Sequence, residues 1–94
     1  MQILIDLTYQ AKVAEMNLYF SGSLPICRLM TSSDNEQWVV SSEVPAYDGK
    51  ANEVNVVTFD VGSKMAQFLR LEIQGRSKGQ TLTLVEFDVW GEIN

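Results

Sequence analysis

The side chains that commonly perform catalysis are few in this chain, and their spacing supports no catalytic site. There is no histidine and only one cysteine, Cys27. Serine and cysteine nucleophiles need a neighbouring base, usually histidine, so Ser-His-Asp triads and Cys-His pairs are excluded. The carboxylate pairs, Asp34 with Glu36 and Glu86 with Asp88, lie in a predicted turn or at alternating strand positions, where acids usually face water. No glycine-rich phosphate loop is present either, so the sequence predicts a protein that is not an enzyme.

The single cysteine also limits other chemistry. One cysteine permits neither an intramolecular disulfide nor a multi-cysteine metal site. Cys27 lies in the apolar run at 25–30, where a small buried hydrophobic side chain is expected.

The charge balance argues against two classes of partner. Twelve acidic and seven basic residues give a net charge of −5, whereas binding to phosphates needs clustered lysine and arginine. The nearest approach to a cluster is Arg70, Arg76 and Lys78, which Glu72 interrupts. No apolar run approaches the roughly 20 residues of a membrane-spanning helix, and the opening MQILID lacks the basic start of a signal peptide. We expect no nucleic-acid partner, no membrane insertion and a chain that starts directly in a strand.

Hydrophobic and polar residues alternate over most of the chain, which is typical of half-buried β-strands. The runs predicted as strands are 2–7, 12–20, 26–31, 37–44, 54–61, 67–74 and 81–90. Glycine, proline and short polar residues separate these runs, as in sandwiches and barrels. In the last run, strict alternation places these side chains on one face: Leu82, Leu84, Glu86, Asp88 and Trp90. The sequence predicts one all-β domain over residues 1–94, an antiparallel, jelly-roll-like β-sandwich of about seven strands.

Two side chains of this predicted sandwich have a structural interpretation. Trp38 follows a run of turn-forming residues, and its large apolar ring is expected to cover the turn rather than to stack on a ligand. Arg70 lies between apolar neighbours and is expected to pair with an acid on an adjacent strand, with Glu72 and Glu86 as candidates. Such a pair fixes strand register more than it stabilises the fold.

Three segments, in order along the chain, carry a resemblance to a known family. ILIDLTYQAKVAEMNLYF is similar to a strand reading hydrophobic-Asp-Leu, a turn, and a strand ending in Leu-Tyr. LMTSSDNEQW is similar to a V-S-x-Asp-Gly-x-x-Trp hairpin, and AQFLRLEIQGRSKGQTLTLVEFDVWGE to an ending that closes on Val-Tyr-Gly. With all three, the chain resembles the discoidin, or coagulation factor V/VIII type C (F5/8 type C), superfamily. That resemblance implies a galactose-binding-like jelly roll shortened at its N-terminus.

The resemblance also shows which of the family's site residues have no counterpart here. In carbohydrate-binding members an N-terminal segment supplies most of a calcium cage, and only the glutamate of the closing strand has a match, Glu86. Because calcium takes about 6–8 oxygen ligands, we expect no calcium and no other cofactor. Sugar-binding members also use a histidine, an arginine, an asparagine and an aromatic ring. The loop at 21–25 lacks the arginine and asparagine, and residues 76–80 lack the ring.

The favoured function is a non-catalytic binding module that resembles discoidin-type carbohydrate-binding domains. It would engage a glycan or a protein through loops 21–25, 45–52 and 75–80. Tyr47 supplies a ring beside polar groups, as small-ligand sites require, although a tyrosine that caps the sandwich edge is the alternative. The candidate ligand-binding residues are Tyr47, Asp48, Lys50, Arg76, Lys78 and Gln80.

The alternative function is structural. A reduced sandwich leaves strand edges unpaired, and such edges recruit other chains, so a homo-oligomer or virion-type subunit completed by a partner chain is the second hypothesis. An acidic mimic of nucleic acid is a weaker third, because the acids are spread rather than massed. The resemblance implies an extracellular or virion-associated protein.

Overall fold

The computed structural model describes residues 1–75 and 81–93, and all regular structure among them is β-strand. The strands are β1 (Gln2–Leu24), β2 (Cys27–Ser32), β3 (Val39–Val44), β4 (Tyr47–Asp48), β5 (Val54–Ile73) and β6 (Leu82–Ile93). Every pairing between them is antiparallel, which confirms the predicted all-β, antiparallel class. Within these residues no helix is long and apolar enough to cross a membrane.

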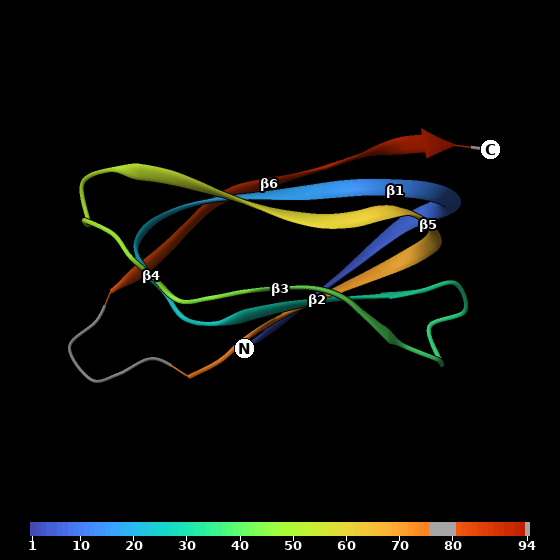
Figure 1. Ribbon diagram of the computed structural model, residues 1–94, viewed down its shortest axis with the longest axis horizontal. Coiled ribbons are helices and arrows are strands. Elements are labelled where there is room, and N and C mark those ends of the chain that lie inside the picture. Colours follow the sequence, from blue (N-terminus) through green and yellow to red (C-terminus); the bar gives the residue numbers. More distant parts are fainter. Residues whose placement is uncertain (76–80, 94) are drawn as a thin grey trace.

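Two long strands, β1 and β5, bend near their middles and run through both layers of a sandwich (Figure 1). The first layer has the order β3, β2, the second half of β5 and the first half of β1. The second layer has the first half of β5, the second half of β1, and β6. The short β4 pairs with the last residues of β1.

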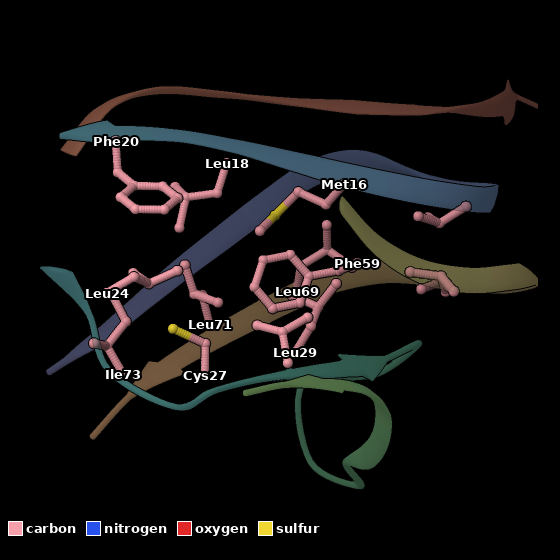
Figure 2. Packing of buried hydrophobic residues seen from close by; sticks show 14 residues of the cluster. Met16, Leu18, Phe20, Leu24, Cys27, Leu29, Phe59, Leu69, Leu71 and Ile73 are labelled. Carbon is pink, nitrogen blue, oxygen red and sulfur yellow. The ribbon is translucent and has the colours of Figure 1, made fainter. Parts of the chain in front are cut away.

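The hydrophobic core lies between the two layers (Figure 2). Alternate residues of a strand point to opposite faces, so each layer directs every second side chain inward. The second layer contributes the fully buried Met16, Leu18, Phe20 and Phe59. The first layer contributes the fully buried Cys27, Leu29, Leu69 and Leu71. Burying each large apolar side chain stabilises the fold by roughly 1.5–3 kcal/mol, and Cys27 is buried as predicted.

β-Bulges bend the two long strands without ending their pairing. In β1, residues 7–10 stand against residue 67 of β5, and Thr8 has a φ of 75°. The Asp6 carboxylate accepts a hydrogen bond from the Thr8 N–H at 2.8 Å, which holds this corner. In β5, residues 61–63 stand against residue 14 of β1, and Gly62 and Ser63 have φ values of 75° and 62°. Extra residues in one strand bend it and increase its twist, and this lets one strand serve two layers.

The predicted number of strands is wrong, because two of the observed strands continue through these bends. The runs 2–7 and 12–20 form the single strand β1, and the runs 54–61 and 67–74 form the single strand β5. The predicted loop at 45–52 contains β4, so the described residues hold six strands rather than about seven. The prediction separated each pair because turn-forming residues at a bulge look the same as those at a strand end.

A further bulge in β6 corrects the predicted faces of that strand. Tyr19 of β1 pairs with Glu86, but the next residue, Phe20, pairs with Leu84, so Val85 is an extra residue. The bulge reverses the alternation. The inward residues before it are Leu82 and Leu84, and the outward residues after it are Glu86, Asp88 and Trp90.

Arg70 does not pair across strands as predicted. Its guanidinium lies over the Trp38 ring, 4.5 Å from the centroid, and its Nε is 3.9 Å from a carboxylate oxygen of Glu72 on its own strand. Glu72 instead pairs with Arg28, its direct neighbour on β2, at 2.7 Å, while Glu86 belongs to the outer face of the other layer. The Trp38 ring therefore packs against the Arg70 guanidinium, in line with its predicted structural role.

Candidate functional site

The predicted loops at 21–25 and 45–52 lie together at one end of the sandwich, next to Thr81, the residue before β6 (Figure 1). Most of the first loop is instead the end of β1, and the second contains β4. The Gly22 N–H donates to the Lys50 carbonyl at 3.2 Å. We call this region the loop end.

Two close backbone approaches hold the loop end together. The Ser23 N–H donates to the Thr81 carbonyl at 2.9 Å. Gly22 has a φ of +89°, and a Cβ added there would lie 2.2 Å from the Thr81 carbonyl oxygen. A Cβ at Gly49 would lie 2.6 Å from the Gly22 carbonyl oxygen. Only glycine fits such contacts, so β1, β4 and the start of β6 approach backbone to backbone.

Tyr47 of β4 is anchored at the loop end while much of its side chain stays in solvent. Its ring packs edge-on against Phe20, with centroids 5.6 Å apart and an interplanar angle of 83°. Its hydroxyl donates to the Asn55 side-chain carbonyl at 3.2 Å. Tyr47 is nevertheless 48% exposed. It caps the sandwich, as the alternative interpretation held, and also presents an aromatic surface of fixed orientation.

The structure brings two further predicted site residues to the same place. Asp48 accepts a hydrogen bond from the Ser23 hydroxyl at 2.8 Å, and Asp48 and Lys50 are both exposed. Tyr47, Asp48 and Lys50 therefore lie within one short exposed segment of the loop end, with Tyr47 on the face of the buried Leu24 and Asp48 on the opposite face with Ser23. The remaining predicted ligand residues lie outside the described residues: Arg76, Lys78 and Gln80.

Sequence reasoning missed Asn55, the residue that orients Tyr47. Asn55 is half-buried on β5, and its side-chain amide also donates to the Glu53 carbonyl at 3.4 Å. In strict alternation position 55 shares the inward face with Val57 and Phe59. A polar residue at an inward position where a strand begins is the signal that could have found it.

The residues present do not fit the family's calcium site. Glu86 is exposed on the outer face of β6, opposite Tyr19 of β1. In residues 1–75 and 81–93, no three His, Cys, Asp or Glu side chains gather to hold a metal ion. A calcium cage needs about 6–8 oxygens, and Glu86 alone does not supply it. The absence of any cofactor stays a prediction.

A second polar cluster, which we call the Asp88 network, spans the outer face of the second layer. Asp88 accepts hydrogen bonds from Asn17 Nδ2 at 2.9 Å, the Tyr19 hydroxyl at 3.1 Å and Trp90 Nε1 at 2.9 Å. The Thr58 hydroxyl donates to Asn17 at 2.6 Å. The hydrogen bond from Asn17, followed by those from Tyr19 and Trp90, lowers the pKa of Asp88. The hydrogen bond to Asp88, followed by burial, raises the pKa of Tyr19. The network spans three strands, so spacing along the sequence does not reveal it.

No protein-family model and no curated protein matches this chain. Solved structures do match. The C-terminal domain of a chitobiase from Bacteroides fragilis has a TM-score of 0.70 and 21% identity, covering 99% of this chain and 64% of that domain. CpGH89CBM32-6, produced by Clostridium perfringens, has a TM-score of 0.68 and 17% identity, covering 96% of this chain and 68% of that chain.

These matches establish the fold. The chain shares the β-sandwich fold of these two structures, in line with the fold that its three sequence segments predicted. It spans less than two thirds of the chitobiase domain. Identity of 17–21% supports the fold, and the function is argued from the site.

Proposed function

We propose that this chain is a non-catalytic binding module that holds a glycan at the loop end. The observation that carries the proposal is Tyr47, whose half-exposed ring is fixed by Phe20 and Asn55. The exposed Asp48 and Lys50 follow it in the same short segment. The fold supports the proposal, since one of the two matched structures, CpGH89CBM32-6, carries in its name the designation of a carbohydrate-binding module.

The chemistry of the loop end suits a sugar. A pyranose has an apolar C–H face that packs on an aromatic ring and hydroxyl groups that need donors and acceptors at its rim. Tyr47 offers the ring at low entropic cost, because its hydrogen bond to Asn55 already restricts it. Asp48 supplies acceptor oxygens and Lys50 supplies donors.

The same residues supply no catalytic chemistry. The chain has no histidine, and Tyr47 and Asp48 lie on an exposed end of the sandwich. Glycoside hydrolysis needs two carboxyl groups on either side of the scissile bond, with one held protonated by its surroundings. Asp48 is exposed and is engaged by the Ser23 hydroxyl, so it is suited to binding.

A glycan array with three forms of the chain tests the proposal. Wild type is expected to be retained, and Tyr47→Ala to lose retention. The control is Tyr9→Ala, because Tyr9 is 59% exposed but lies at the bend of β1, at the opposite end from β4 (Figure 1). If no glycan retains the wild type, or if both variants bind as it does, the proposal fails.

The second candidate function is assembly with a partner chain. The first half of β5 is an edge of the second layer, and its outward Val54 and Val56 are 63% and 56% exposed. Exposed apolar side chains on an unpaired edge favour association. Light scattering after size exclusion tests the homo-oligomeric form of this candidate: a dimer or larger species supports it, and a monomer opposes it.

A further inference from the structure

The edge of β6 offers a long, unpaired run of backbone. Among the described residues β1 is the only strand that pairs with β6. After the bulge at Val85, each residue from 86 to 93 has a partner on β1, and the one further irregularity is an extra residue on β1, Ala14, between the partners of Trp90 and Gly91. On its other side, alternate N–H and C=O groups face outward, and such an edge accepts an added strand.

The inward side of this edge is apolar and open. Phe87 is 45% exposed and Ile93 is 72% exposed, although their partners on β1 are buried. Gly91 lies between them along β6 and lines a groove of about 210 Å³, together with Val89 and Tyr9. A strand added here would bury apolar side chains on its inward face.

The outward side of the same edge is acidic and carries an exposed ring. Glu86, Asp88 and Glu92 face outward in alternation with the inward residues, and Trp90 between them is 61% exposed. Glu15 adds a carboxylate directly opposite Trp90 on β1. Among the described residues none of these acids forms an ion pair. Lys12 of β1 lies opposite Glu92 without forming an ion pair, so this face keeps an excess of acids, and a cationic partner would relieve the repulsion between them.

We propose that the β6 edge binds an extended segment of another protein in which apolar and basic residues alternate. Because side chains of a strand alternate between faces, the apolar ones would cover Phe87 and fill the groove at Gly91. The Lys or Arg residues would face Glu86 and Glu92 and lie against the Trp90 ring, where cations are attracted to the π-face. The inference goes beyond the glycan site. It rests on the second candidate function, to which it assigns one surface and one kind of partner.

Charge argues for this occupant over a second copy of the chain. In a symmetric antiparallel pair of β6 strands centred on Val89, Glu86 of each copy lies opposite Glu92 of the other. Directly opposed like charges destabilise a strand pair. A segment with basic residues at those positions gains attraction where the second copy meets repulsion.

Fluorescence anisotropy with labelled eight-residue peptides tests the proposal on the full chain. A peptide that alternates valine and lysine is expected to bind, more weakly as salt is added. A peptide that alternates valine and glutamate, and a Val-Lys peptide with N-methylated backbone, are expected not to bind. Substituting both Glu86→Gln and Glu92→Gln is expected to weaken binding about fivefold, through the loss of two exposed ion pairs. The matched control, Glu43→Gln with Glu53→Gln, is expected to leave it unchanged.

Several results would overturn the inference. These are no binding of the Val-Lys peptide, equal binding of the acidic or N-methylated peptide, and equal weakening by the control variant. A dimer that the Val-Lys peptide does not dissociate would place a second copy on this edge. Glycan retention, measured on the same preparation, shows whether a failure is confined to the β6 edge.

Discussion

Replacing Gly22 by alanine tests the backbone contact that holds the loop end together. Gly22 combines a φ of +89° with a Cβ position 2.2 Å from the Thr81 carbonyl oxygen. Two other glycines separate these effects. Gly62 has a φ of +75°, but its added Cβ meets nothing within 4 Å. Gly91 is the reverse case, because its Cβ would lie 2.1 Å from the Lys12 carbonyl oxygen and no positive φ is involved.

The expected losses of stability follow from the positive φ and from the clash of the added Cβ. An alanine held in a left-handed conformation costs roughly 1–2 kcal/mol, so Gly62→Ala is expected to lower the free energy of unfolding by about 1 kcal/mol. A steric clash in a packed site costs typically about 1–3 kcal/mol, which is the expectation for Gly91→Ala. Gly22→Ala carries both and is expected to lose about 3 kcal/mol, equivalent to a fall in Tm of roughly 12–24 °C for a domain of this size.

Urea unfolding followed by circular dichroism, with thermal melts in parallel, measures all three variants. The order of destabilisation predicted is Gly62→Ala least and Gly22→Ala most. If Gly22→Ala and Gly62→Ala lost equal stability, the end of β1 and the start of β6 would not be in contact, and the geometry of the loop end would be wrong.

Three further predictions concern the core and the turn before β3. Burial raises the pKa of the Cys27 thiol to about 11, so Ellman's reagent at neutral pH is expected to label it only in urea, and rapid labelling of the folded chain would contradict its burial. Phe59 is fully buried, so Phe59→Ala is expected to lower the free energy of unfolding by about 3–5 kcal/mol, and a loss below about 1 kcal/mol would contradict the core packing. Hydrogen bonds from the Gln37 and Glu36 N–H groups lower the pKa of Asp34. Asp34 therefore stabilises the fold above its unfolded pKa of about 3.9 and loses this effect as the pH falls towards the lower folded value. Asp34→Asn is expected to flatten this acid dependence in urea titrations, and an unchanged dependence would count against the interpretation.

Alternation in the sequence predicted which side chains form the core, because the period of a strand is a local property of the backbone. Leu69, Leu71 and Ile73 alternate along the run predicted as a strand at 67–74, and all three are buried. The sequence could not show that the runs 2–7 and 12–20 form one strand, since this depends on the pairing of β1 with β5 around Thr8. One unpaired residue, Val85, was enough to reverse the expected faces of β6.

Only part of the candidate site could be predicted, because local sequence patterns do not show contacts between strands. Tyr47, Asp48 and Lys50 were recognisable as a ring with polar neighbours in a turn-rich segment. The contact of Tyr47 with Phe20 and its hydrogen bond to Asn55 join three strands, and no local pattern encodes them. The Asp88 network likewise exists only once β5, β1 and β6 are placed side by side.

The central claim is that a glycan binds at the loop end. An ¹H–¹⁵N NMR titration of the full chain with a glycan retained on the array tests it most directly. We predict that the amide signals which shift belong to Gly22, Tyr47, Asp48, Lys50 and Asn55, while those of Phe87 to Ile93 stay in place. Shifts confined to β6, or no shifts with any glycan, would contradict the account.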